Sequence, residues 1–234
     1  MKLYLYQDPD GYCYNSDSIF LFSFIKMFRI KGDVLDIGLG VGVISLLISK
    51  HYRANICAVE KQEQMYFYAQ KNCKVNSKNI EISYCDYQEY QAKREFDFIV
   101  SNPPFYSVDQ HQSPNRSKNI ARYAHHLPLE LFIAKSAKLL KPRGYFIFCY
   151  DASQIDRILT LLKKSKMQVE FLKFLHSKAD KEAKIVMIAA RKNSNARCRV
   201  LSPFITFNGD GSYTQEAQQA FKDANTHSIK AVYD

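Results

Sequence analysis

Short apolar runs alternate with amphipathic stretches along most of the chain. Runs rich in Val, Ile and Phe occupy residues 34–37, 56–59, 80–84, 96–101, 145–150, 169–175 and 184–190. Helical patterns lie between them, over residues 43–50, 62–76, 128–140 and 154–166. Strands that alternate with helices are typical of a sheet built from βα units. The pattern therefore predicts an α/β fold, with a mostly parallel seven-stranded sheet and helices on both faces.

The chain has the size of one domain with small additions. Its 234 residues show no internal repeat, low-complexity tract or linker, so we expect a single domain over residues 1–234. The sheet and its helices fill residues 31–192, after an N-terminal segment, residues 1–30, that holds an aromatic helix. Residues 193–234 form an addition with a strand at 199–207, a turn at 208–211 and a helix for which Ser212 and Gln215 form a capping box.

Composition narrows the class of protein. Apolar residues make up 47% and charged residues 24% of the chain, which is ordinary for a globular protein. No run approaches the ~20 apolar residues of a membrane span and the N-terminus lacks a signal peptide, so we expect a cytoplasmic protein without a membrane partner. The six cysteines are scattered singly, and His125-His126 has no partner ligand at a supporting spacing, so we expect no metal. The net charge of +10 favours a polyanionic partner.

A glycine-rich segment follows the first core strand. It reads Asp36-Ile37-Gly38-Leu39-Gly40-Val41-Gly42 and leads into the first core helix. Glycines allow a ligand to approach the backbone, and a helix N-terminus offers free N–H groups to a negative group. The spacing fits neither the dinucleotide fingerprint nor a Walker loop, because Val43 stands where the former needs glycine and no Gly-Lys-Ser/Thr occurs. The segment indicates a nucleotide-like cofactor, with a turn that binds nothing as the alternative.

Two acidic residues end the next two strands. Glu60 lies about 20 residues beyond the glycines, where a carboxylate can accept from both hydroxyls of a ribose. Asp86 follows the third strand and could accept from an adenine amino group. Each has a structural alternative, as a helix-capping acid for Glu60 and as a turn residue for Asp86. Together with the glycines they trace an arc along the carboxyl ends of the strands, where open α/β sheets bind ligands.

The fourth strand ends in Asn102-Pro103-Pro104-Phe105. The prolines stop the strand and leave carbonyl groups unpaired, Asn102 adds an acceptor, and Phe105 can stack on a planar ring. Such a wall can hold a planar amino group, which indicates transfer to nitrogen. The alternative is a strand terminator followed by a loop.

These motifs together resemble the class I S-adenosylmethionine-dependent methyltransferases. The resemblance implies a Rossmann-like fold with S-adenosyl-L-methionine as cofactor. It implies that the cofactor is bound by Asp36, Gly38, Gly40, Gly42, Glu60 and Asp86. It also makes Asn102, Pro103, Pro104 and Phe105 the catalytic wall, since Asn/Asp-Pro-Pro-aromatic is the motif of enzymes that methylate planar amino or amide nitrogens.

A resemblance to the bacterial tRNA1(Val) adenine-37 N6-methyltransferase family runs nearly end to end. It rests on Tyr14 to Leu21, the core motifs, Ala121-Arg122-Tyr123, Lys184-Ile185-Val186 and the ending from Asn208 to Phe221. It implies that residues 1–30 pack over the cofactor with Asp17 helping to close the site, for which helix N-capping by Ser16 or Asp17 is the alternative. Phe105 replaces a frequent tyrosine, and Asn15-Ser16 stands where Gly-Thr is expected.

The polar stretch from residue 106 to residue 126 predicts a long functional loop. Arg116, Lys118, Arg122 and Tyr123 combine positive charge with an aromatic face, as single-stranded RNA requires, so they are candidate RNA contacts. A solvated loop is the alternative. For the second basic group, Lys178, Lys181 and Lys184, a solvated surface is the preferred interpretation.

The leading hypothesis is an N6-adenine methyltransferase that acts on a tRNA. A protein-glutamine N5-methyltransferase acting on a release factor is the first alternative, because a glutamine amide fits the same wall. DNA adenine methylation and a non-catalytic RNA-binding protein with this fold are the others. The oligomeric state stays open.

Overall fold

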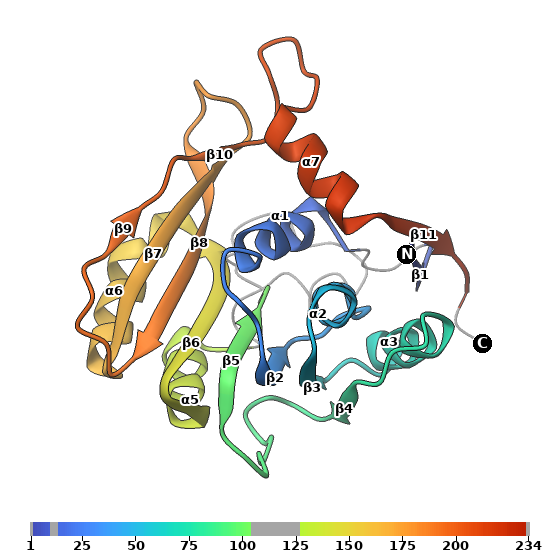
Figure 1. Ribbon diagram of the computed structural model, residues 1–234, viewed down its shortest axis with the longest axis horizontal. Coiled ribbons are helices and arrows are strands. Elements are labelled where there is room, and N and C mark those ends of the chain that lie inside the picture. The colour runs from blue at the N-terminus through green and yellow to red at the C-terminus, as the bar shows by residue number, and fades with distance from the viewer. Residues whose placement is uncertain (1, 10–13, 104–126, 233–234) are drawn as a thin grey trace.

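The apolar runs form adjacent strands of one twisted sheet in the computed structural model, which describes residues 2–9, 14–103 and 127–232 (Figure 1). The strands are β2 (Gly32–Ile37), β3 (Ala54–Glu60), β4 (Glu81–Tyr84), β5 (Phe96–Ser101), β6 (Leu140–Asp151), β7 (Met167–His176) and β8 (Ala183–Lys192). Their order is β4-β3-β2-β5-β6-β8-β7. Six of these strands run in the same direction, and β8 runs antiparallel to them. The predicted Rossmann-like α/β fold and its mostly parallel seven-stranded sheet are confirmed.

The single strand predicted over residues 199–207 is wrong. Two short strands, β9 (Arg199–Val200) and β10 (Phe204–Ile205), pair instead with the outer edge of β7. Pro203 lies between them and has no N–H group to donate to a ladder, so the pairing with β7 is interrupted there.

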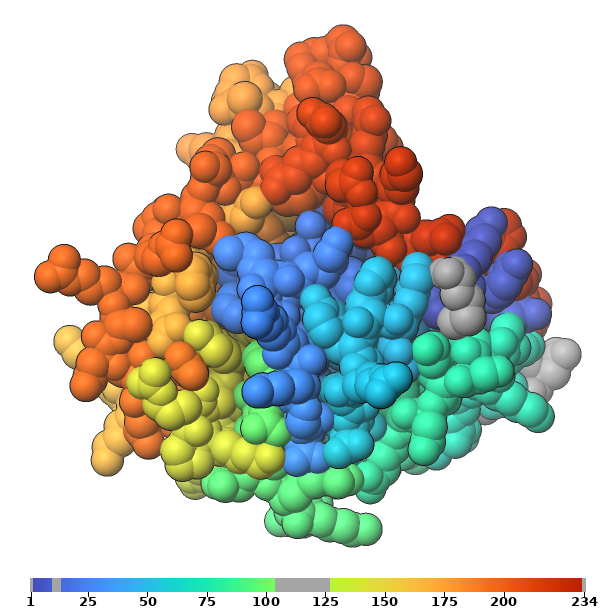
Figure 2. Space-filling model, viewed as in Figure 1, coloured from blue at the N-terminus to red at the C-terminus, as the bar shows by residue number. Residues whose placement is uncertain are grey.

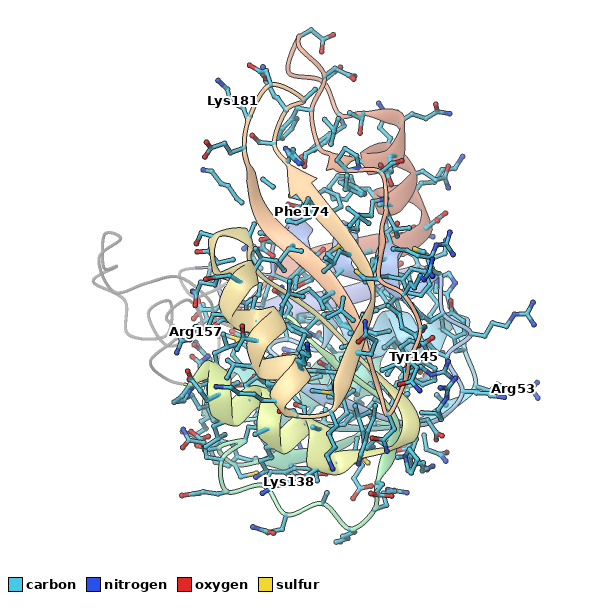
Figure 3. The ribbon with its side chains drawn as sticks, turned by 90° about the vertical axis from the view of Figure 1, so that its left-hand side faces the viewer. Arg53, Lys138, Tyr145, Arg157, Phe174 and Lys181 are labelled. Atoms are coloured by element: carbon cyan, nitrogen blue, oxygen red, sulfur yellow. The ribbon has the colours of Figure 1, made fainter. Side chains whose placement is uncertain are left out.

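Helices cover both faces of the sheet, as predicted. They are α1 (Ser16–Ile25), α2 (Val43–His51), α3 (Glu63–Val75), α5 (Leu129–Leu139), α6 (Ile155–Lys164) and α7 (Gln215–Ala224), with a 3-10 turn, η2 (Ala152–Gln154), before α6. Figures 1 and 3 show α5 and α6 side by side on one face and α1 and α2 on the other. The sheet is therefore buried from both sides, which explains its continuous apolar runs. Among the residues described, no helix has the length and apolar character needed to cross a membrane.

The two ends of the chain meet in a second, small sheet that the sequence did not predict. Here β1 (Leu3–Gln7) pairs in parallel with β11 (Thr226–Lys230). The segment that leads to β11 forms a ridge over α1 and α2 (Figure 2). Beneath it, Phe20 of α1 packs on Phe204 of β10 with ring centroids 4.4 Å apart. The capping box predicted for α7 is also wrong, because the N-cap is Thr214, whose hydroxyl accepts from the Ala217 N–H at 3.2 Å.

The sheet has a switch point between β2 and β5. The chain leaves the end of β2 toward β3 on one side, and leaves the end of β5 toward β6 on the other. Ligands of open α/β sheets bind in the crevice that such a switch creates at the carboxyl ends of the strands. The glycine loop follows β2 and Asn102 follows β5, so the fold brings both motifs to this crevice.

Candidate active site

The glycine loop turns the chain from β2 into α2 through backbone conformations that favour glycine. Gly38, Gly40 and Gly42 have φ values of 72°, 56° and 92°. A Cβ atom on Gly38 or Gly40 would have no neighbour within 4 Å, whereas one on Gly42 would lie 3.7 Å from the Ala69 Cβ of α3. The first two glycines thus border open space that a ligand can enter, and the third faces the neighbouring helix.

Glu60 holds this loop from the end of β3. Its Oε2 atom accepts from the Gly40 N–H at 2.7 Å, and its Oε1 atom accepts from the Gln62 N–H at 2.8 Å. The side chain is buried, and burial raises the pKa of the carboxyl group. The backbone of Lys61 also bonds to this carboxylate. A carboxylate has about four acceptor sites, so Glu60 retains capacity to accept from a hydroxyl group of a ligand above the glycines.

Asp36 lies beneath the loop. It is only 1% exposed, and its Oδ2 atom accepts from the Ser45 hydroxyl of α2 at 2.7 Å. Burial raises its pKa to about 7. Asp36 therefore acts on the loop through the start of α2, because its own carboxyl group is closed off from a ligand.

Asp86 lies beside Glu60, just beyond β4, the neighbour of β3 in the sheet. Its Oδ1 atom accepts from the Gln88 N–H at 2.9 Å, which closes a tight turn, and its Oδ2 atom lies 3.5 Å from the Lys61 ammonium group. The turn alternative for Asp86 is thus realised, because its carboxylate bonds to the backbone that follows it. The alternative for Glu60, a surface acid that caps the next helix, is wrong, because Glu60 is buried and the N-cap of α3 is Gln62. Both acids also stand at the crevice with oxygen lone pairs available.

Asn102 opens onto the same pocket as the glycine loop. The residues that line this pocket are Tyr14, Ser18, Gly38, Leu39, Gly40, Val41, Val43, Ile44 and Asn102. Within the pocket, the Asn102 Nδ2 group donates to the Ser18 hydroxyl at 2.9 Å, and the Cys149 thiol of β6 donates to Asn102 Oδ1 at 2.9 Å. Pro103 follows and is buried. The structure therefore joins the glycine loop and Asn102 in one cavity.

Three residues of this site were not selected from the sequence: Tyr14, Ser18 and Cys149. Tyr14 lines the pocket and its hydroxyl lies 3.0 Å from Thr226 Oγ1 of β11, which ties the pocket wall to the C-terminal strand. Tyr14 and Ser18 belong to the segment that carried the family resemblance, which was a usable signal. A lone cysteine in an apolar strand, such as Cys149, gives no such signal.

Asp17 lies in the first turn of α1, next to Ser18. The helix begins at Ser16 and its N-cap is Asn15, so N-capping by Ser16 or Asp17 is not what the structure contains. The Asn15 Nδ2 group donates to Asp17 Oδ2 at 2.6 Å, and burial raises the Asp17 pKa to about 6. Asp17 is thus a partly buried carboxyl group on the element that forms one wall of the pocket.

Six predicted site residues lie outside the described part of the chain. They are Pro104, Phe105, Arg116, Lys118, Arg122 and Tyr123. Their roles stay predictions.

The positive charge of the chain is concentrated in one half of the fold. Residues 127–202 carry 16 Lys and Arg against 6 Asp and Glu, a net charge of +10, whereas residues 14–103 carry 11 against 10. The first segment forms α5, β6, α6, β7 and β8, and the second holds the glycine loop, Glu60 and Asp86. The half that holds the glycine loop is therefore nearly neutral, and residues 127–202 hold the excess of positive charge.

Four lysines lie at or just beyond the C-terminal ends of α5 and α6, and we call them the lysine cluster: Lys138 of α5 (labelled in Figure 3), Lys163 and Lys164 of α6, and Lys166 after it. They are exposed, and no carboxylate of the described residues pairs with them. Two of them also line a pocket with Asn193 and Asn195 at the end of β8.

Curated relatives are named tRNA1(Val) (adenine(37)-N6)-methyltransferase. One from Phocaeicola vulgatus is 30% identical over 159 residues, which are 67% of this chain and 68% of the relative. Another from Pedobacter heparinus is 28% identical over 195 residues, which are 82% of each chain.

Solved structures share the fold at lower identity. A predicted O-methyltransferase from Agrobacterium tumefaciens superposes with a TM-score of 0.68 at 15% identity, over 92% of this chain and 99% of the other. The 16S rRNA N2 G1207 methyltransferase of T. thermophilus, solved with S-adenosylmethionine and guanosine, gives a TM-score of 0.56 at 21% identity, over 79% of this chain and 44% of the other.

The sequence profile of the methyltransferase small domain matches residues 15–174, from the start of the pocket wall to the end of β7. This range contains the glycine loop, both acids and Asn102. The match, the strand order and the geometry of the crevice agree: the chain belongs to the methyltransferase small domain family and is a class I S-adenosylmethionine-dependent methyltransferase.

Proposed function

We propose that the protein transfers a methyl group to the exocyclic N6 nitrogen of adenine in RNA, with a tRNA as substrate and adenosine 37 as its target. The observation that carries the reaction type is the pocket shared by Gly38, Gly40 and Asn102. The names of the relatives support the choice of adenine 37 and of tRNA. In this proposal the protein acts on the tRNA in the cytoplasm. All of its residues belong to one methyltransferase domain.

The residues present fit the cofactor. The open space over Gly38 and Gly40 admits a ligand close to the backbone, and Glu60 would accept from its ribose hydroxyls. Asp86 would accept from the adenine amino group, while Asp17 would close the pocket from α1. In this proposal two residues shape the loop without contacting the cofactor. Gly42 packs against α3, and Asp36 holds the start of α2 through Ser45.

Bound S-adenosylmethionine supplies an electrophilic methyl group on a positively charged sulfur. The protein mainly has to align donor and acceptor, since displacement at the methyl carbon needs no strong base. The lone pair of an adenine amino group is delocalised into the ring, so the group is a poor nucleophile. Asn102 Oδ1 and the Pro103 carbonyl would accept from its two N–H bonds, hold the nitrogen toward the methyl group and favour the charge that develops there. The methylated nitrogen then loses a proton to water.

The base must leave its stack to reach this pocket. Phe105 would stack on the base, and Pro104 would keep the wall rigid. Arg116, Lys118, Arg122 and Tyr123 would bind the flanking nucleotides. These assignments rest on the resemblance of the motif and on the composition of the loop.

The lysine cluster would bind the phosphates of the same RNA away from the pocket. Met187 of β8 pairs with Cys149 beside Asn102, and Lys192 lies five residues further along β8, next to the cluster. At 3.4 Å per residue this separation is about 17 Å. A structured RNA that presents one unstacked base can span this length and offers a row of phosphates to the cluster.

The reaction type is tested with Asn102→Ala. We expect methyl transfer to fall at least a hundredfold while the affinity for S-adenosylmethionine, measured by calorimetry, stays within about twofold, because Asn102 serves the acceptor. Asn55→Ala, at the far end of β3, is the control and should keep full activity. Equal loss of cofactor affinity and of turnover in Asn102→Ala would mean that Asn102 is structural.

A further inference from the structure

The side-chain amide of Asn102 is held at two points by residues from different elements. The Cys149 thiol of β6 donates to Oδ1 at 2.9 Å, and Nδ2 donates to the Ser18 hydroxyl of α1 at 2.9 Å. An asparagine amide otherwise rotates over a broad range of χ2. A contact at each end of the amide fixes both the plane of the group and the direction of its oxygen.

The chemistry of Cys149 suits the role of donor. Its side chain is 1% exposed, and burial raises its pKa well above the ordinary value of a thiol, with the nearby Asp17 carboxyl group acting in the same direction. The sulfur therefore keeps its proton at neutral pH, and it has a hydrogen to give to Oδ1. A thiolate at this place would repel Oδ1 and leave the amide free to turn.

The arrangement leaves Asn102 ready for a substrate. A carbonyl oxygen has two lone pairs, and the thiol occupies one of them, so the second is available to an N–H group that enters the pocket. Fixing the acceptor beforehand lowers the barrier, because no rotation has to be arrested when the amine binds. The described residues thus contain a support for Asn102 that the sequence motif does not include.

We propose that Cys149 and Ser18 are positioning residues for methyl transfer, which hold the Asn102 amide with its oxygen toward the acceptor nitrogen. This inference rests on the proposed transfer to nitrogen. It adds two residues outside the Asn-Pro-Pro-Phe motif to the determinants of turnover, one on the helix that forms the pocket wall and one in the strand next to β5.

Cys149→Ala and Cys149→Ser test the proposal as a pair. Alanine and serine are close in size and differ in the hydroxyl donor. We expect the kcat of Cys149→Ala and of Ser18→Ala to fall about tenfold, the effect of one lost hydrogen bond to a reacting group. Cys149→Ser should keep at least half of the wild-type kcat, and the dissociation constant of S-adenosylmethionine should not change in either Cys149 variant. Cys73→Ala, a truncation of another buried cysteine, is the control and should leave kcat unchanged.

A second readout needs no turnover. NMR relaxation of the Asn102 side-chain NH2 group should give a high order parameter in the wild type and in Cys149→Ser, and a lower one in Cys149→Ala. Unchanged kcat and order in Cys149→Ala, or equal losses in Cys149→Ser and Cys149→Ala, would overturn the proposal. If the wild type methylated no nitrogen at all, the proposed function would fail, while the relaxation measurement would still decide whether the amide is held.

Discussion

Asn72 connects the glycine loop, which we expect to bind the cofactor, to the N-terminal strand β1. Replacing Asn72 therefore tests how much this loop contributes to stability and to cofactor affinity. Asn72 is fully buried in α3. Its Nδ2 group donates to the Val41 carbonyl at 2.9 Å and to the Tyr6 carbonyl at 3.0 Å, while its Oδ1 atom accepts from the Tyr6 N–H at 2.7 Å. One side chain thus serves both as a partner for β1 and as a clamp on the loop between Gly40 and Gly42.

The variant Asn72→Ala leaves three backbone groups without this partner. A buried polar group that loses its hydrogen bond costs about 1–3 kcal/mol. Two of the three groups belong to the half-buried Tyr6, where water can replace part of the loss, so we expect a total near 3 kcal/mol. In a protein of this size that corresponds to a fall in Tm of roughly 6–12 °C. Release of the Val41 carbonyl should also weaken S-adenosylmethionine binding about tenfold, because the loop is no longer fixed before the cofactor arrives.

Asn76→Ala is the matched control. Asn76 lies one turn further along α3 and holds β1 in the same way, with hydrogen bonds to both backbone groups of Tyr4, but it does not contact the cofactor loop. Both variants should unfold at a lower temperature in calorimetric scans. Cofactor titration, performed well below both transitions, should be weakened in Asn72→Ala alone. Equal cofactor affinity in the two variants would mean that the hydrogen bond from Asn72 to the Val41 carbonyl does not prepare the loop for the cofactor.

Further outcomes concern Glu60, Asp36 and the lysine cluster. Glu60→Gln should weaken S-adenosylmethionine binding at least tenfold in calorimetry, because an amide nitrogen cannot accept from the Gly40 N–H or from a ribose hydroxyl. Asp36→Asn should flatten the pH dependence of stability in urea titrations. Burial raises the Asp36 pKa from 3.8 to about 7, so its carboxyl group weakens the folded state as pH rises from about 4 to about 7, and the variant should lose that decline. Lys163→Glu with Lys166→Glu should raise the KM for RNA and reduce the slope of log KM against log salt by about 2, with cofactor affinity unchanged. The same double charge change at Lys74 and Lys93, in the nearly neutral half, should have a smaller effect on both quantities.

Local sequence patterns were sufficient for the core of the fold. The run from Phe96 to Ser101 matches the bounds of β5, because four of its six residues are apolar, as is typical of a buried strand in a parallel sheet, and the prolines after it mark its end. The meeting of Gly38, Gly40 and Asn102 in one pocket also followed from the sequence, since the carboxyl ends of parallel strands share one edge of the sheet.

Contacts between distant segments could not be read from the sequence. The pairing of β1 with β11 joins the two ends of the chain, and neither strand carries a turn or period that identifies its partner. The contacts of Asn102 with Ser18 and Cys149 depend on how α1 and β6 pack beside β5, which no local pattern encodes. The interruption at Pro203 was visible in the sequence, however, because proline cannot donate to a strand ladder.

We expect the protein to methylate adenine in RNA at the pocket beside Asn102. The direct measurement is transfer of a labelled methyl group from S-adenosylmethionine to unmodified tRNA, to a release factor and to duplex DNA in parallel, with nucleoside and amino-acid analysis of the products and Asn102→Ala as the inactive control. We expect N6-methyladenosine in the tRNA and a background signal from the other two substrates. Label found in the glutamine of the release factor, with none in the tRNA, would contradict it.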